Sequence, residues 1–417
     1  MVGRLVPDFA AGLILVAGWI LLGIARPAEA LAGFASKDWL LVLSIYGLAA
    51  ATARSGVLFR VGLFLVRRLP PGLFWQTLTL LATGLLLTPL VPSSTGRASL
   101  TAPLSLAVAD ALRLPERSRA AALLGLGTWL GSGPLMFVFL NGSGTCLLAW
   151  GLLPEASRAR FTWVMWFVAA APLGLFVCAG ALWALFTMFR PETVAAPSHE
   201  RINLQVAVLG RPAMAEIVTL AVLVLTVAGW VVAPFFGLDL GAIALLGLLV
   251  TVLAGAFDHR ALQALDWNFL LFFGVVLTIG RLVVSLELDR AAVAAIEATL
   301  GALRLGPLTF VLAVTLISLV VRLLLDQDLT VLLASLTLIP LAPSVGADPW
   351  LTVIALLATS VLWFLPSQTP SYLVAQSASE GRLFSHEQAR RFALGYTGVT
   401  LAAMVACVPY WRWLGLL

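Results

Sequence analysis

Apolar runs about as long as a bilayer is thick dominate this sequence. A helix that crosses the hydrocarbon core needs about 20 largely apolar residues, and such runs recur from about residue 8 to residue 416. Hydrophobic residues make up 61% and charged residues 11% of the 417-residue chain, against about 45–50% and about 25% in soluble domains. No soluble core is large enough to hide so much apolar surface. The sequence therefore predicts an all-α polytopic membrane protein and excludes a soluble enzyme, a nucleic-acid-binding protein and a secreted disulfide scaffold.

Three pairs of motifs recur in the same order and indicate an internal duplication. The pairs are Asp38-Trp39-Leu40-Leu41 with Asp266-Trp267-Asn268-Phe269-Leu270-Leu271, Pro103 with Pro340, and Gly131-Ser132-Gly133-Pro134 with Pro366-Ser367-Gln368-Thr369-Pro370. Both aspartates are expected to cap the helices that follow them, and many secondary transporters are built from repeats of this kind. We divide the chain into an N-terminal helix and loop (1–37), a first repeat (38–188), a cytoplasmic linker with connecting helices (189–265) and a second repeat (266–417).

The placement of basic residues indicates that the two repeats are inverted. We interpret residues 72–110 and 306–343 as re-entrant hairpins that enter the membrane from opposite sides. One face of the protein then collects 15 basic residues, namely Arg4, Arg54, Arg60, Arg67, Arg68, Arg113, Arg117, Arg119, Arg190, Arg201, Arg211, Arg260, Arg382, Arg390 and Arg391. The opposite face has eight, namely Arg26, Lys37, Arg158, Arg160, Arg281, Arg290, Arg304 and Arg412. The positive-inside rule makes the first face cytoplasmic, which places the N-terminus in the cytoplasm and the chain in a bacterial inner membrane.

Four polar segments interrupt the apolar runs, at residues 92–99, 125–134, 326–330 and 359–371. Irregular backbone at membrane depth must line a cavity that protein or water fills, because lipid cannot satisfy its polar groups. Glycine and proline break the helices there. Serine, threonine and freed carbonyl groups then offer oxygen atoms to a cation, while new helix N-termini offer N–H groups to an anion. A cavity built from these segments can hold an anion beside its coupling ion.

Four charged residues fall inside the predicted spans, where charges are costly and usually functional. Arg97 has no acidic neighbour in the sequence, so it is expected to hold an anionic substrate, to pair across the repeats with Asp326 or Asp328, or to lie in water at a hairpin base. Arg322 and Asp326 are four residues apart and can form a structural pair on one helix. Asp326 and Asp328 are also candidate proton carriers.

At these motifs the chain resembles the divalent anion:sodium symporter family, within the wider ion transporter superfamily. That family has a Ser-Asn-Thr turn ten residues before a proline, and Ser93-Ser94-Thr95 precedes Pro103 by the same spacing. Gly127-Thr128-Trp129-Leu130-Gly131-Ser132-Gly133-Pro134 is similar to its glycine-rich stretch, and Leu365-Pro366-Ser367-Gln368-Thr369-Pro370-Ser371-Tyr372 to its second proline motif. Asp326-Gln327-Asp328-Leu329-Thr330 stands where a second Ser-Asn-Thr is expected, and is similar instead to the cation antiporter and arsenite branches of the superfamily.

The resemblance implies a homodimer with an elevator-type fold, in which each repeat has a re-entrant hairpin and a broken transmembrane helix. Substrate would lie between the hairpin turns, flanked by cation sites, and would be a dicarboxylate, a tricarboxylate or sulfate. Candidate substrate ligands are Ser93, Ser94, Thr95, Arg97, Pro134, Thr369 and Pro370. Candidate ligands of the coupling cation are Ser93, Ser94, Gly127, Thr128, Gly131, Asp326, Asp328, Thr330, Ser360 and Ser367.

The expected function is therefore secondary transport of small anions across the lipid bilayer, driven by sodium or protons. No cofactor is expected beyond the coupling ion, and no metal beyond transported or coupling sodium. The alternative is a cation/proton antiporter or an arsenite-type exporter that uses Asp326 and Asp328. An intramembrane enzyme is not expected, because no His-Glu-x-x-His or Gly-x-Gly-Asp motif occurs.

Overall fold

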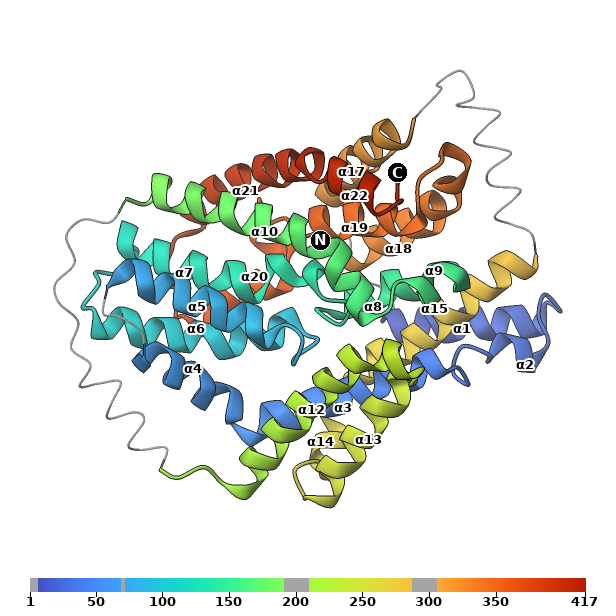
Figure 1. The fold of residues 1–417 in the computed structure, drawn as a ribbon, viewed down its shortest axis with the longest axis horizontal. Helices are drawn as coiled ribbons and strands as arrows, with labels where there is room; N and C mark the ends of the chain where they lie inside the picture. Colours follow the sequence, from blue (N-terminus) through green and yellow to red (C-terminus); the bar gives the residue numbers. More distant parts are fainter. Residues whose placement is uncertain (1–6, 69–71, 191–209, 287–305) are drawn as a thin grey trace.

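The computed structural model describes residues 7–68, 72–190, 210–286 and 306–417. These residues form helices joined by short loops, with no strand among them (Figure 1). Residues 191–209 of the predicted linker region (189–265) lie outside the described residues, and so do Arg4, Arg201, Arg290 and Arg304.

The described helices alternate between long apolar rods and short pieces that fill the breaks between them. In the first half they are α1 (Asp8–Leu21), α2 (Pro27–Ala30), α3 (Lys37–Ser55), α4 (Val57–Arg68), α5 (Leu73–Leu87), α6 (Ser94–Ala111), α7 (Arg119–Ser132), the 3₁₀ helix η1 (Pro134–Val138), α8 (Gly144–Gly151), α9 (Glu155–Arg160) and α10 (Trp163–Met188). In the second half they are α12 (Met214–Phe236), α13 (Leu240–Leu253), α14 (His259–Gln263), α15 (Trp267–Ser285), α17 (Pro307–Leu324), α18 (Gln327–Leu338), η2 (Ile339–Leu341), η3 (Pro343–Val345), α19 (Pro349–Ser360), η4 (Pro366–Gln368), α20 (Pro370–Ala378), α21 (His386–Ala406) and α22 (Val408–Trp413).

Several of these helices are suited to a lipid environment. Five helical stretches of the described chain are long and apolar enough to cross a membrane, namely Arg119–Val138, Trp163–Met188, Met214–Phe236, Pro307–Leu324 and His386–Trp413. Large apolar side chains such as Leu175, Leu225 and Leu253 remain on the surface, where water would disfavour them and hydrocarbon does not. The predicted all-α polytopic membrane fold is confirmed.

The two repeats run in opposite directions. Helix α3 begins, and helix α15 ends, at the walls of one cavity, which Lys37 and Asp38 line from α3 and Arg281 and Ser285 line from α15. Since α3 and α15 both begin at equivalent Asp-Trp motifs, the repeats are inverted. Asp266 caps α15 as predicted, accepting a hydrogen bond from the Phe269 N–H at 3.1 Å. The cap of α3 is Ser36 instead, and Asp38 faces Arg158 at 3.8 Å.

Each repeat contains a helical hairpin packed on a broken helix. The first hairpin is α5 and α6, which pack against α7, and the second hairpin is α17 and α18, which pack against α19. After the breaks the repeats exchange partners, because α8 packs against α18 and α20 packs against α6. Helices α10 and α21 lie side by side along one edge of the molecule, opposite α3, α12 and α13 (Figure 1).

The broken helices form the centre of the core. Every residue of α19 from Trp350 to Ser360 is buried, and so is every residue of α7 after Arg119. An aromatic cluster joins the two: the ring of Trp129 meets that of Trp363 edge to face at 4.4 Å, and Trp363 lies 5.0 Å from Tyr396. Such contacts fix the two repeats to each other close to their breaks.

Ion pairs hold the bases of the hairpins on opposite faces. At the base of the first hairpin, Arg382 contacts Asp110 at 2.7 Å and Glu116 at 2.9 Å, and hydrogen bonds to these carboxylates raise the pKa of Arg382. At the base of the second hairpin, Arg160 contacts Asp348 at 2.9 Å. Each pair joins segments at the same face, as inverted hairpins require.

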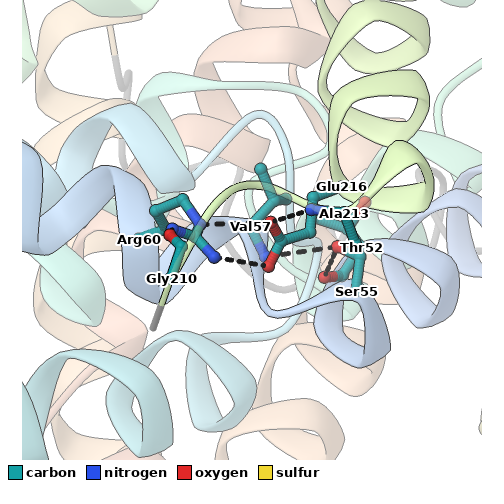
Figure 2. A network of polar contacts seen from close by, with 7 residues as sticks. All are labelled: Thr52, Ser55, Val57, Arg60, Gly210, Ala213 and Glu216. Carbon is teal, nitrogen blue, oxygen red and sulfur yellow. Dashed lines mark hydrogen bonds and ion pairs between the residues drawn. The ribbon is translucent and has the colours of Figure 1, made fainter. Parts of the chain in front are cut away.

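A polar network joins α4 to the start of α12 (Figure 2). Arg60 lies one turn after the bend at Gly56, whose φ of 75° ends α3. The Arg60 guanidinium contacts the Glu216 carboxylate at 3.1 Å and donates to the Gly210 carbonyl at 2.8 Å, while Glu216 accepts the Ala213 N–H at 3.0 Å. Because α4 also packs against both arms of the first hairpin, this network ties the hairpin to α12.

We expect Glu216→Gln to lower the free energy of unfolding by about 1–2 kcal/mol, because the substitution removes a charged partner from a largely buried pair. The matched control is Glu387→Gln, which removes the charge from the exposed Glu387–Arg391 pair and should cost no more than about 0.5 kcal/mol. Thermal unfolding of the purified variants measures both losses. Equal losses would contradict the role given to Arg60 and Glu216.

Candidate functional site

The first helix break follows α7, at the place where α7 packs closely against α5 of the first hairpin. Helix α7 ends at Ser132, and the chain runs through η1 and an irregular stretch before α8 begins at Gly144. Pro134 has no N–H with which to continue the helix. A Cβ atom at Gly131 would lie 2.1 Å from the Leu81 carbonyl oxygen of α5, so only glycine lets α5 approach this closely. The predicted cation-site residue Gly131 is thus a packing position.

The second helix break follows the same plan. Helix α19 ends at Ser360, and residues 361–369 cross to α20 through η4. The Thr359 hydroxyl contacts the Ser318 hydroxyl of α17 at 2.9 Å, and the Thr369 hydroxyl donates to the Leu362 carbonyl. Side-chain hydroxyls therefore satisfy groups that the broken helix leaves exposed.

Each hairpin turn is closed by a side-chain cap on its second arm. The Ser93 hydroxyl accepts the Gly96 N–H at 3.1 Å at the start of α6 and lies 2.9 Å from the Thr95 hydroxyl. Asp326 accepts the Leu329 N–H at 3.0 Å at the start of α18. These caps end the chain reversal and fix where the second arm of each hairpin begins.

Arg97 binds three backbone carbonyls that belong to different parts of the first repeat. Its side chain is fully buried. It donates to Ser132 at the end of α7 at 2.8 Å, to Val91 in the hairpin turn at 2.5 Å, and to Gly142 beyond the break at 2.6 Å. Its Nη2 is buried and has no hydrogen-bond partner among the described residues. Arg97 thereby fixes the hairpin turn to both sides of the break.

Arg322 makes the same three kinds of contact in the second repeat. It donates to Ser360 at the end of α19 at 2.5 Å, to Leu325 in the hairpin turn at 2.7 Å, and to Gln368 beyond the break. It also lies 3.3 Å from the Thr369 hydroxyl. Each repeat therefore has one buried arginine that joins its hairpin turn to its broken helix.

The charges of these arginines suit their positions. The carbonyls at the end of a helix carry partial negative charge, and each guanidinium meets the last carbonyl of a broken helix. Arg97 has no ion pair within the described part of the chain, so its positive charge is balanced by carbonyl dipoles alone. A region with this charge distribution favours a bound anion.

The two hairpin turns meet on the segment between α7 and α8. Arg97 of the first hairpin contacts Ser132 and Gly142 in this segment. From the second hairpin, Asp328 accepts the Thr145 hydroxyl at 2.6 Å, and Gln327 lies 3.4 Å from the same hydroxyl. Residues 132–145 are thus the place where the two repeats come together.

Four helices begin at the hairpin turns and just after the helix breaks. They begin at Ser94 (α6), Gly144 (α8), Gln327 (α18) and Pro370 (α20). Thr145 in the first turn of α8 contacts Asp328 in the first turn of α18, and α20 packs against α6. Helix N-termini carry unsatisfied N–H groups and partial positive charge, which bind anions.

The remaining predicted residues divide into buried and accessible groups. Gly127 packs against the Thr77 side chain of α5, and the Thr128 and Thr330 hydroxyls donate to carbonyls of their own helices. Ser94 and Thr95 are half-buried at the first turn, whereas Ser367 and Pro370 are exposed beyond the second break. Ser360 and Thr369 lie at Arg322, which donates to the Ser360 carbonyl and lies 3.3 Å from the Thr369 hydroxyl.

Several residues of the meeting segment were not predicted from the sequence. Asn141 donates to the Pro89 carbonyl at 2.7 Å, and Thr145 contacts the second hairpin. The signal was present, because Asn141-Gly142-Ser143-Gly144-Thr145 is a polar, glycine-rich cluster inside an apolar run. It has no counterpart among the repeated motifs, which is why the duplication did not point to it.

A family model described as the sodium:sulfate symporter transmembrane region matches residues 3–417 of the chain. The chain belongs to this family. The membership expected from the hairpin and glycine-rich motifs is thereby confirmed. The family is one of membrane transporters and not of enzymes.

Relatives of this sodium:sulfate symporter family member occur in several bacteria. It is 25% identical to the inner membrane protein YbhI of Escherichia coli over 65% of the chain and 58% of YbhI. It is 23% identical to the putative malate transporter YflS of Bacillus subtilis over 64% of the chain and 55% of YflS. A membrane protein of Cupriavidus necator is 23% identical over 93% of the chain and 77% of that protein. The chain thus spans little more than half the length of YbhI and YflS.

The fold of this symporter family member also resembles a solved transporter. The YdaH transporter of Alcanivorax borkumensis superposes with a TM-score of 0.60 over 90% of the chain and 85% of YdaH, at 17% sequence identity. At this identity the likeness concerns the fold alone.

Proposed function

We propose that the chain is a secondary active transporter that carries small anions of the dicarboxylate, tricarboxylate or sulfate class, coupled to sodium or protons. The observation that carries the proposal is the meeting of both hairpin turns on residues 132–145, beside the N-termini of α6, α8 and α18. Such an arrangement stabilises a small dianion through backbone N–H groups. The half-buried hydroxyls of Ser94 and Thr95 and the buried Nη2 of Arg97 are the side-chain donors proposed for it.

Asp328 is the proposed site of the coupling ion at the second turn. Asp326 is used as the cap of α18, whereas Asp328 accepts a hydroxyl from Thr145 on the other repeat. A carboxylate between the two repeats can bind a proton or a sodium ion beside the anion and offset its charge. The name of the Bacillus subtilis relative makes malate the first anion to test.

The proposed mechanism is an elevator-type movement within a homodimer in the inner membrane, with the N-terminus in the cytoplasm. The hairpins and broken helices pack closely on one another, whereas α3, α12 and α13 pack mainly among themselves. The first group is proposed to move against the second with the anion enclosed. The bend at Gly56 between α3 and α4 is one place where the two groups join.

We expect Ser94→Ala and Thr95→Ala each to reduce malate uptake by about 10-fold or more, since a hydrogen bond to a charged group contributes about 1.5–3 kcal/mol. Uptake into proteoliposomes under a sodium gradient and under a proton gradient measures the effect and identifies the coupling ion. The control is Ser99→Ala, an exposed serine on the same helix. Uptake that neither substitution alters would remove these hydroxyls from the site.

The second candidate function is a cation/proton antiporter or arsenite-type exporter that uses Asp326 and Asp328. The Asp328–Thr145 contact between repeats is compatible with it. We expect Asp328→Asn to abolish gradient-driven malate uptake if the first proposal holds. Cation-driven proton flux in the absence of any organic anion would favour the antiporter instead.

A further inference from the structure

A cavity of about 1110 Å³ lies outside the meeting point of the hairpin turns. On one side it is walled by the first residues of α3 and α13 and the last turn of α15, and on the other by the end of α8, by α9 and by the base of the second hairpin. Helix α8 separates it from the hairpin turns, since Thr145 in the first turn of α8 contacts Asp328 and Trp150 near its end lines the cavity. Most of these helices begin or end at the cavity. We therefore infer that the cavity lies at the membrane boundary, where the helices leave the hydrocarbon core.

The charged groups around this cavity are balanced. Its lining includes three cations and three carboxylates, namely Lys37, Arg158, Arg281, Asp38, Glu155 and Asp239. Some are partly used by the fold. Arg158 donates to the Gly151 carbonyl at 2.9 Å, and the Asp239 carboxylate accepts the Ala242 N–H at 2.9 Å. Together they form a mixed ring with no net charge.

Two buried donors in the cavity wall have no partner among the described residues. The Ser335 side chain is fully buried and the Trp150 side chain is 5% exposed. Neither the Ser335 hydroxyl nor the Trp150 indole N–H has a hydrogen-bond partner. Both donors lie beneath the accessible surface of the cavity, so the charged side chains of the lining are the groups that a ligand would contact.

The remaining walls and the rim are apolar. Leu41, Leu153, Leu336 and Ile339 are among the lining residues. At the rim, Leu238 is 53% exposed and the preceding Phe235 is 82% exposed. An apolar rim of this kind is suited to contact with lipid chains.

We propose that this cavity binds a phospholipid with a zwitterionic headgroup, in which a phosphate and an amine lie close together. The phosphate would be held by the Lys37 and Arg281 cations of the lining. The amine would face the carboxylates, and the acyl chains would lie along the apolar wall and the exposed rim.

The transported dianion is the competing occupant, and two observations disfavour it. At about 1110 Å³ the cavity is larger than the range of about 300–1,000 Å³ that holds drug-sized ligands, so a four-carbon acid would fill little of it. A lining with no net charge also gives a dianion no net attraction, whereas a zwitterion satisfies both signs of charge.

Thermal unfolding of the delipidated full chain in detergent tests the proposal directly. We expect phosphatidylethanolamine to raise the melting temperature by several degrees, because a ligand that binds the folded state stabilises it by mass action. Anionic phosphatidylglycerol should raise it less, and malate should not compete. Native mass spectrometry should detect about one phosphatidylethanolamine bound per chain, as expected if one lipid occupies this cavity.

Gly280→Leu is the decisive variant. Gly280 lines the cavity in the middle of a helix, and a Cβ there would meet only the Gly151 carbonyl, at 3.7 Å. The leucine should project into the cavity next to Arg281, obstruct the lipid headgroup and remove the lipid-dependent rise, while the melting temperature without lipid stays close to that of the wild type. The matched control is Gly398→Leu, whose Cβ would have no neighbour within 4 Å, and it should keep the full rise.

A second variant keeps the proposal testable if Gly280→Leu does not fold. Lys37→Gln combined with Arg281→Gln leaves the apolar wall intact and should weaken phosphatidylethanolamine binding without abolishing it. Equal stabilisation by both lipids, a rise that survives Gly280→Leu, or displacement of the lipid by malate would each overturn the proposal. None of these readouts depends on transport, so failure here leaves the proposed function untouched.

Discussion

Arg97→Ala is expected to leave little folded protein. The substitution removes every hydrogen-bond donor to three backbone carbonyls, those of Val91, Ser132 and Gly142. Each buried acceptor left without a partner costs about 1–3 kcal/mol, and the lost side chain also leaves a cavity. The sum approaches the whole stability of a typical domain, about 5–15 kcal/mol. Fluorescence-detected size exclusion and thermal unfolding should show aggregated or strongly destabilised protein.

Two further variants separate a positioning role of Arg97 from a ligand role. Arg97→Lys keeps the charge but not the planar fork that reaches three acceptors, so it should be intermediate in stability. Arg412→Ala removes an exposed arginine and should behave as the wild type. A folded Arg97→Ala variant with an unchanged melting temperature and only a raised KM for the anion would mean that Arg97 is chiefly a substrate ligand.

Gly131→Ala is expected to have the second largest effect on stability. The added Cβ would lie 2.1 Å from the Leu81 carbonyl oxygen and 2.9 Å from its carbon, both backbone atoms of α5. Neither atom can rotate away, so the first hairpin must shift away from α7. Overpacking of a tight contact costs about 1–3 kcal/mol and occasionally more. We expect a melting temperature lowered by several degrees and a comparable loss of uptake.

The matched control for this prediction is Gly398→Ala in α21. Its Cβ would meet no atom within 4 Å, and alanine favours the helix over glycine by about 1 kcal/mol. This variant should be as stable as the wild type or slightly more stable. If both glycine variants unfold at the same temperature, the close approach of α5 to α7 is not a determinant of the fold.

The architecture could be predicted from the sequence because it rests on hydrophobicity and on repeated motifs. Long apolar runs specify helices in lipid. Basic residues in the loops, such as Arg382 and Arg160, indicate that the two hairpins are inverted. Prolines and glycines at 131–134 and 366–370 predict broken helices, and both are broken. These are local properties that a chain displays without its tertiary contacts.

The partners of the buried arginines could not be predicted in the same way. Arg97 follows its hairpin turn on α6, whereas Arg322 precedes its turn on α17, so the duplication does not align them. Their partners are backbone carbonyl groups, some nearby and some 35 to 46 residues away in sequence. Every residue has a backbone carbonyl, so no residue type in the sequence marks the partner. The sequence suggested aspartate or substrate as partners, because only side chains are visible in it.

The role of Asp38 was missed for a related reason. A helix cap is a local feature, and Asp38 was expected to act as one, but Ser36 two residues earlier takes that position. Asp38 is then directed toward Arg158, a contact across about 120 positions that no local pattern reveals. Asp266, which has no such competitor, caps its helix as predicted.

In the proposed site, the turn of the second hairpin packs on residues 132–145, the segment between α7 and α8 of the first repeat. Cysteines placed at Thr145 and Asp328, whose side-chain oxygens are 2.6 Å apart, test it in a background without Cys146, Cys178 and Cys407. We expect this pair to form a disulfide rapidly in membranes under mild oxidation, since disulfides require Cβ atoms about 3.5–4.5 Å apart. A control pair at Thr145 and Ser344 should remain reduced. If the first pair stays reduced and only the control pair forms a disulfide, the two hairpin turns do not meet and the proposed site does not exist.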